Sequence, residues 1–225
     1  DPVEEYGIPP HNELVQFFKE NLRQTDELYP NAAFTGGRYH SLFSACIRAF
    51  GWEMFMWAAQ SEPRRFGMVL DGFAEITKAE IHACLDAGAP LYLMHDDIVW
   101  TSGPVFAPEW YRTYIFPKYK EYWRLVHEAG RKVIFCSDGD WTVFIEDIAE
   151  AGADGFIFEP TTSLEKIVSL YGKSHAIMGN GDCRILQFGT KEDIRREVAR
   201  CVNLGRDCPG YFMIVGNHIP NRIPL

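Results

Sequence analysis

Short apolar runs, each ending abruptly in polar or glycine residues, recur six times along the chain. Strands that are buried on both faces have this continuous apolar pattern, and helical patterns between them are typical of parallel βα units. Because chemistry in parallel α/β folds lies at the carboxyl ends of the strands, the polar clusters are expected to share one active-site rim. The runs predict parallel strands, in chain order, near residues 32–36, 91–95, 132–136, 154–159, 176–179 and 211–216.

Helical periodicity and capping residues predict the segments between the strands. Residues 10–28 have an amphipathic pattern, and residues 42–60 form a second helical region broken near Gly51. A Ser61 cap with Pro63 in the first turn predicts a long helix that ends near Gly88. Further helices are expected from Ala107, divided at Pro117, over residues 141–151 and 163–171, and after a capping box of Thr190 and Asp193.

The strand count favours an α/β fold of the (β/α)8 TIM-barrel type, incomplete with about six βα units, in a single domain over residues 1–225. An open doubly wound sheet is the alternative, but residues 179–181 lack the third glycine of a dinucleotide site. A barrel without its first two units exposes strand edges, which favours pairing with another segment or chain, as in a homodimer.

Composition restricts the class of protein further. A hydrophobic content of 47% in 225 residues is enough for a substantial core. A formal charge of -9 argues against a sequence-independent hold on nucleic acid, and no apolar stretch reaches the roughly 20 residues of a membrane span. Without a signal-peptide pattern, and with six scattered cysteines that suggest free thiols, a cytoplasmic protein is expected.

Three ionisable residues, His95, Asp96 and Asp97, follow the second predicted strand. Adjacent carboxylates repel each other when both are charged, which suits general acid/base work or the capture of a cation. The alternative is structural: one aspartate bonds the loop backbone and the other pairs with an arginine such as Arg112. We expect the cluster to act in substrate binding and catalysis.

Cys136 and Asp138 lie two positions apart after a strand, so that their side chains can face the same side. Divalent metals accept thiolate, imidazole and carboxylate, which makes Cys136, Glu159 and His218 candidate ligands beside Asp138. In the competing interpretation, Cys136 is a small core residue and Asp138 or Asp140 caps the next helix.

Two further polar residues are candidates for substrate binding. Arg38 follows two glycines and could hold a carboxylate with two hydrogen bonds, although a surface arginine after a turn has the same pattern. Asn180 lies beside Gly181 and Asp182, where the chemistry of a tight turn is an adequate alternative explanation.

Five polar motifs follow one another along the chain, at residues 95–97, 108–112 with Pro117, 134–140, 179–182 and 216–220. In this order and from residue 94 onward, the chain resembles the uroporphyrinogen decarboxylase superfamily. This superfamily of (β/α)8 barrels contains heme-pathway decarboxylases and zinc-dependent methyltransferases that act on corrinoid proteins. Its members usually carry about two more strands before the point where this sequence begins, and in decarboxylases these supply tetrapyrrole-binding arginines.

The resemblance also contains two departures. Decarboxylases carry a histidine where this chain has Asn217, with His218 beside it. Methyltransferases place a zinc-binding His-x-Cys-Gly at residues 136–139, which here read Cys-Ser-Asp-Gly, and a third ligand, cysteine, at the position of Asn217. The spacing of two coordinating residue types is therefore kept, while their identities differ.

The resemblance implies an enzyme, and the favoured function is methyl transfer between a small substrate and a corrinoid carried by a partner protein, assisted by zinc. The alternatives are a lyase that decarboxylates a tetrapyrrole or another carboxylated ring, with Asp96 or Asp97 stabilising a protonated intermediate, and a non-catalytic binding protein. The acidic rim weighs against a substrate with many carboxylates. The expected site comprises Asp96, Asp97, Asp138 and His218 as catalytic residues, Arg38, His95, Asn180 and Asn217 as substrate-binding residues, and Cys136, Glu159 and His218 as metal ligands.

Overall fold

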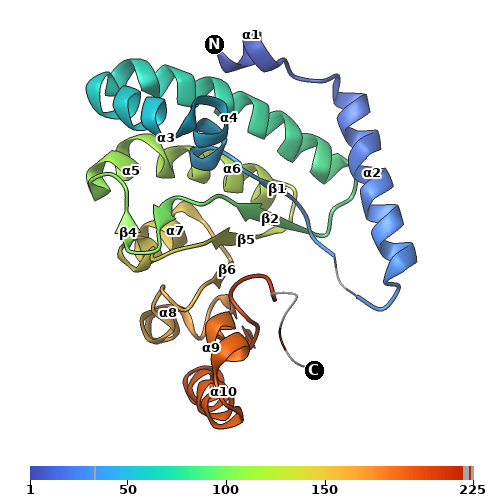
Figure 1. The fold of residues 1–225 in the computed structure, drawn as a ribbon. Coiled ribbons are helices and arrows are strands. Elements are labelled where there is room, and N and C mark those ends of the chain that lie inside the picture. Colours follow the sequence, from blue (N-terminus) through green and yellow to red (C-terminus); the bar gives the residue numbers. More distant parts are fainter. Residues whose placement is uncertain (33, 220–222, 224–225) are drawn as a thin grey trace. The chain divides into compact units, whose positions relative to one another are not determined.

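A computed structural model describes residues 1–32, 34–219 and 223 of the chain (Figure 1). The chain forms two compact units, which we describe separately. Unit 1 comprises Asp1–Asp96 and Glu109–Val133, and unit 2 comprises Asp97–Pro108 and Ile134–Leu225. Both units are built from parallel strands that alternate with helices, as the sequence pattern predicts.

Unit 1 contains one parallel strand pair and most of the long helices. Strand β1 pairs with β2 in parallel, with Arg38 opposite Met94 and Tyr39 opposite His95. The elements, in chain order, are α1 (Pro2–Tyr6), α2 (His11–Leu28), β1 (Gly36–Tyr39), α3 (Phe43–Ser61), α4 (Pro63–Asp86), β2 (Leu91–His95), α5 (Pro108–Tyr114) and α6 (Phe116–Glu128).

Unit 2 contains the later βα units and a small hairpin. Strands β5, β6, β7 and β8 pair successively in parallel, and β3 pairs with β4 in antiparallel orientation. The elements are β3 (Val99–Trp100), β4 (Gly103–Pro104), β5 (Lys132–Ser137), η1 (Thr142–Phe144), α7 (Ile145–Ala151), β6 (Gly155–Phe158), α8 (Leu164–Tyr171), β7 (Ala176–Met178), α9 (Cys183–Phe188), α10 (Lys191–Gly205) and β8 (Tyr211–Phe212).

The first strand is the main correction to the sequence prediction. The predicted strand at residues 32–36 is wrong in position, because β1 begins at Gly36, and residue 33 lies outside the described residues. The glycines are strand residues rather than a loop: a Cβ on Gly37 would lie 2.0 Å from the Leu93 carbonyl oxygen, and one on Gly36 would lie 2.3 Å from the Cys84 Sγ. Close packing against β2 and α4 therefore selects glycine here.

The helix predictions hold in most places. Gly51 interrupts α3 with a positive φ of 71°, Pro117 lies in the first turn of α6, and Thr190 and Asp193 form the predicted capping box of α10. The Ser61 cap is wrong: Ser61 is the last residue of α3, and Glu62, between the helices, makes no side-chain cap bond to α4. No helix in the described part of the chain is long and apolar enough to cross a membrane.

Candidate functional site

Asp96 is a fully buried carboxylate that caps helix α3 in unit 1. It accepts hydrogen bonds from the backbone N–H groups of Leu42 at 3.0 Å, Phe43 at 2.9 Å and Ser44 at 2.9 Å. The Ser44 hydroxyl and the Tyr119 hydroxyl each donate to it at 2.6 Å. The Asp96 carboxylate thus accepts from N–H groups that have no partner within the helix, which is a structural role. Asp97 is left as the catalytic candidate of the two, and its catalytic role stays a prediction.

The bond from Tyr119 to Asp96 can be tested against a matched tyrosine. Both Tyr119 and Tyr92 are buried, but the Tyr92 hydroxyl has no hydrogen-bond partner in the described residues. Burial, reinforced by the charge of Asp96, raises the pKa of Tyr119, so this hydroxyl stays a donor. Tyr119→Phe is expected to lower the free energy of unfolding by about 1.5–3 kcal/mol, the usual contribution of a hydrogen bond to a charged group.

Tyr92→Phe is the control, because it removes a buried hydroxyl that bonds no other described residue. We expect its unfolding free energy to stay within about 0.5 kcal/mol of wild type or to rise, since an unsatisfied polar group no longer needs to be buried. Urea unfolding monitored by circular dichroism measures both variants. Equal losses in the two variants would contradict the capping role of the Tyr119–Asp96 bond.

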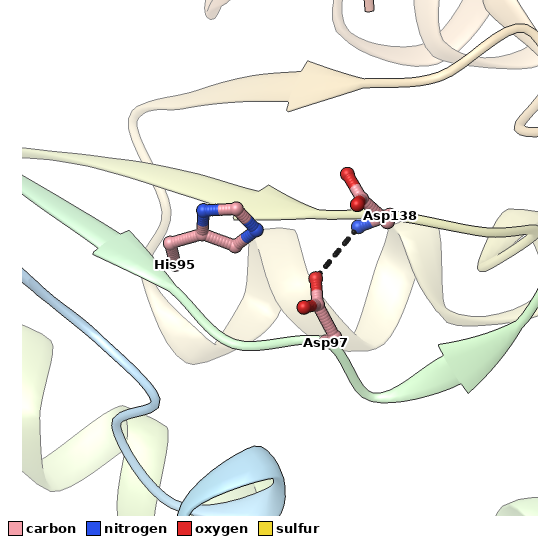
Figure 2. A group of neighbouring side chains, drawn as sticks. All are labelled: His95, Asp97 and Asp138. Carbon is pink, nitrogen blue, oxygen red and sulfur yellow. Dashed lines mark hydrogen bonds between the residues drawn. The ribbon is translucent and has the colours of Figure 1, made fainter. Parts of the chain in front are cut away.

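Asp97, the neighbour of Asp96, belongs to unit 2 and faces different partners. Its Oδ1 accepts a hydrogen bond from the backbone N–H of Asp138 at 3.0 Å (Figure 2). His95, two residues earlier along the chain, is the last residue of β2, and its ring stacks on that of Tyr39 at 3.9 Å between centroids. The two consecutive aspartates after β2 therefore differ in role: Asp96 caps α3, and Asp97 binds the Asp138 backbone.

Three residues from different strand ends converge within unit 2. The Asn217 side-chain amide donates through Nδ2 to Asp138 Oδ2 at 3.3 Å and to Glu159 Oε1 at 2.7 Å. The backbone N–H of Gly139 donates to Glu159 Oε2 at 2.8 Å. We call Asp138, Glu159 and Asn217 the carboxylate cluster. Asp97 lies beside this cluster and accepts the Asp138 backbone N–H. The cluster therefore brings two acidic side chains, Asp138 and Glu159, to one side-chain amide.

The parallel strands explain why these side chains meet. Asp138 directly follows β5 and Glu159 directly follows β6, while Gly181 and Val215 form an isolated parallel bridge that precedes Asn217. Gly139 is required in this arrangement, because its φ is 80° and a Cβ would lie 2.5 Å from the Trp100 carbonyl oxygen. The turn after β5 can therefore direct the Gly139 N–H at Glu159.

A hollow of about 210 Å³ opens beside Glu159 and Asn217. Arg184 lines it but is bonded to Asp182 through both Nε and a terminal nitrogen, at 3.0 and 2.7 Å, and this bonding lowers the pKa of Asp182. The lining contains two carboxylates, Glu159 and Asp182, and one cationic side chain, Arg184, so its formal net charge is negative. The full lining is Thr101, Glu159, Pro160, Thr161, Asp182, Cys183, Arg184 and Asn217.

The two other predicted substrate-binding residues, Arg38 and Asn180, bind groups within the protein. Arg38 lies inside β1, forms an ion pair with Glu80 and donates through Nε to the His40 carbonyl at 3.3 Å. Asn180 is buried, with 1% of its surface exposed, and bonds backbone carbonyls. Their substrate-binding roles stay predictions.

The three predicted metal ligands, Cys136, Glu159 and His218, have different surroundings. Cys136 is a buried free thiol in β5, opposite Ile157 of β6. His218 is exposed, and its backbone N–H donates to Asn217 Oδ1 at 2.6 Å. Glu159 alone of these three belongs to the carboxylate cluster. The metal-binding roles of Cys136 and His218 stay predictions.

Sequence reasoning missed Cys183 and the backbone of Gly139. Cys183 lines the hollow, and its thiol lies 3.7 Å from the Asn217 carbonyl oxygen. Its place directly after the polar residues 179–182 was an available signal. The hydrogen-bonding role of the Gly139 N–H could not be predicted, because backbone donors have no signature in residue type.

Comparison with known proteins places the chain in a family. It is 32% identical over 169 residues to a uroporphyrinogen decarboxylase of Alkalilimnicola ehrlichii, covering 72% of this chain and 44% of the relative. A uroporphyrinogen decarboxylase of Streptomyces avermitilis is 25% identical over 159 residues, which is 71% of this chain and 43% of that protein. The chain thus spans less than half the length of these curated relatives.

A solved structure has the same fold. A methyltransferase from Methanosarcina mazei matches with a TM-score of 0.72 at 18% identity, covering 94% of this chain and 59% of that chain. This likeness confirms the predicted α/β fold class of the TIM-barrel type. The family model described as uroporphyrinogen decarboxylase (URO-D) matches residues 1–225, and the chain therefore belongs to the uroporphyrinogen decarboxylase family.

Proposed function

We propose that the chain acts in a methyltransferase of this superfamily, which moves a methyl group between a small substrate and a corrinoid held by a partner protein. One observation carries the proposal. The resemblance assigns zinc ligands of the methyltransferases to positions 136, 138 and 217. Two of these residues, Asp138 and Asn217, are 79 positions apart in sequence and are joined by a hydrogen bond of 3.3 Å.

The donor set determines which cation the site would accept. Asp138 and Glu159 offer carboxylate oxygens, which suit hard divalent cations and which zinc also accepts. Asn217 directs Nδ2, which cannot coordinate, at both carboxylates, while its Oδ1 accepts the His218 N–H. The residues thus fit an oxygen-ligated divalent cation better than a zinc site rich in thiolates. Such a cation, when bound, would polarise the heteroatom that carries the methyl group.

The chain's own residues would select and hold the substrate. The negative charge of the hollow beside Glu159 favours neutral or positively charged small molecules over polycarboxylates. Gly139 N–H and the Asn217 amide keep the Glu159 carboxylate in a fixed orientation, which supports preorganised binding at the strand ends.

Tetrapyrrole decarboxylation is the second candidate, and the position of Asp97 favours it. The resemblance to the family covers residues 95–97, and Asp97 extends into the same group of strand ends as Asp138. There its carboxylate would stabilise a protonated pyrrole-like intermediate. Against this candidate, Arg184 is the one cationic side chain among the described residues that line the hollow, and it is paired with Asp182. A substrate with many carboxylates needs several cationic side chains that are not already bound to carboxylates of the protein.

Methyl transfer is measured with the purified protein, reduced cobalamin and a panel of methanol, methoxyarenes and methylamines. We expect methylcobalamin to form, as seen by its absorbance, and Asp138→Ala to lower the rate by about 100-fold because the cluster loses a carboxylate. Glu150→Ala, at an exposed position of α7, is the control and should keep the wild-type rate.

The same preparations separate the alternatives. Carbon dioxide release from uroporphyrinogen without methyl transfer would replace the proposal with decarboxylation, and inactivity in both assays would contradict an enzyme of either type. Elemental analysis of wild type and Cys136→Ser tests zinc. Stoichiometric zinc that is lost in the variant would support a thiolate ligand, and a metal-free wild type that still transfers methyl groups would exclude one.

A further inference from the structure

The loop that follows β6 and carries Glu159 is held by a buried hydroxyl. Thr162 is fully buried, and its Oγ1 accepts the backbone N–H of Trp141 at 3.1 Å while donating to the Gly139 carbonyl at 2.8 Å. One side chain therefore fixes both ends of the turn over residues 139–141. The same turn supplies the Gly139 N–H that binds Glu159.

A buried amide connects this loop to helix α10. The Asn180 Nδ2 donates to the Thr162 carbonyl at 3.0 Å and lies 3.5 Å from the Glu159 carbonyl. Its Oδ1 accepts from a terminal nitrogen of Arg200 at 2.9 Å. The amide is therefore bonded on both sides within the protein.

Arg200 is fixed in turn by its own helix. It donates to Glu197 through Nε at 2.9 Å and through a terminal nitrogen at 2.7 Å. Glu197 also accepts the backbone N–H of Asp182 at 3.1 Å. The bond to Arg200 lowers the pKa of Glu197 although burial opposes this, so the pair is ionised at neutral pH.

We propose that Thr162, Asn180 and Arg200 are positioning residues for the carboxylate cluster. They transmit the rigidity of α10 to the loop of Glu159 and to the turn of Gly139, and so keep the 2.8 Å bond between the Gly139 N–H and the Glu159 carboxylate. Their effect on catalysis rests on the proposed function. Misplacing reacting groups by about 1 Å can cost about 100-fold in rate, so a relay outside the site can control turnover.

Thr162→Val and Thr162→Ser form a matched pair for the test. Valine keeps the shape of threonine but can neither accept from Trp141 nor donate to Gly139, whereas serine keeps the hydroxyl. We expect Thr162→Val to lower kcat for methyl transfer about 10-fold or more with KM within about twofold, and Thr162→Ser to stay near wild type. An unchanged kcat in Thr162→Val, or a failure of serine to restore it, would overturn the proposal.

Backbone hydrogen exchange gives a readout that does not need activity. The Gly139 and Trp141 N–H groups should exchange about 10-fold faster or more in Thr162→Val and at the wild-type rate in Thr162→Ser. Without the hydroxyl, the Trp141 N–H loses its acceptor, and the turn that directs the Gly139 N–H at Glu159 loses the bond to its Gly139 carbonyl. The amides of α3 near Asp96 serve as an internal control. Unchanged exchange at Gly139 and Trp141 would overturn the relay even if activity fell.

A second variant keeps the test decisive if Thr162→Val fails to fold. Arg200→Met removes the donor to Asn180 from a partly exposed helix position, and it should accelerate exchange at the same two amides; wild-type exchange there would overturn the relay. If the wild type transfers no methyl group, the proposed function fails on its own. The exchange rates, with rescue by serine, then decide the relay.

Discussion

Asp96→Ala is expected to lower the free energy of unfolding by about 3–5 kcal/mol, the usual cost of removing one side of a buried charged network. The substitution leaves three N–H groups at the start of α3 and the hydroxyls of Ser44 and Tyr119 without their acceptor. Asp96→Asn should fall between wild type and alanine, because an amide offers one accepting oxygen instead of two. Urea unfolding at neutral pH measures the difference.

Asp97→Ala is the matched control for this prediction. Asp97 is the next residue and has the same side chain. It binds the Asp138 backbone beside the carboxylate cluster of unit 2, whereas Asp96 caps α3. The unfolding free energy of Asp97→Ala should fall less than that of Asp96→Ala, because the one N–H known to bind Asp97 contributes about 1.5–3 kcal/mol as a donor to a charged group. If Asp97→Ala were the more destabilised variant, our assignment of the two aspartates would be reversed.

Glu159→Gln should reduce methyl transfer by about 100-fold, since a preorganised electrostatic group is lost. The new amide nitrogen must face either the Gly139 N–H or the Asn217 amide, and both positions place two donors against each other. The unfolding free energy should also fall, by up to about 3 kcal/mol if the buried Gly139 N–H is the donor that loses its acceptor. Steady-state rates and urea unfolding provide the two measurements.

Glu165→Gln controls for the change from carboxylate to amide. Glu165 is exposed in the first turn of α8, where it accepts from the Ser163 hydroxyl at 3.3 Å. Both rate and stability should remain near wild type. A wild-type rate for Glu159→Gln, with folding intact, would remove Glu159 from the site.

Local pattern predicted those elements whose signals are local. Strands β2, β5 and β6 are apolar runs, and the Thr190–Asp193 capping box lies within four residues, so the sequence was sufficient. Strand β1 is different. Its glycines resemble a loop, and the reason for them is contact with Leu93 and Cys84, which only the fold brings close.

The site shows the same distinction between local and long-range causes. Because parallel strands end at one edge, the sequence predicted a single pocket that contains Asp96, Asp97, Cys136, Asp138, Glu159, Asn217 and His218. Hydrogen bonds join Asp97, Asp138, Glu159 and Asn217, whereas Asp96 caps α3 and Cys136 is buried in β5. The sequence could not separate Asp96 from Asp97, since their tasks depend on donors from α3 and α6 and from the turn after β5. Likewise, the pairing of Arg38 with Glu80 in α4 has no local signal.

The hairpin of β3 and β4 contains a constrained residue, Trp100, next to a residue that is open to substitution, Thr101. The Trp100 carbonyl accepts the Asp140 N–H at 3.1 Å and leaves no room for a Cβ on Gly139, so the backbone at this point is fixed. Thr101, one residue further, is exposed and lines the hollow beside Glu159. Side chains at the hairpin tip can therefore diversify, and alter which molecules are admitted, while the carboxylates keep their places.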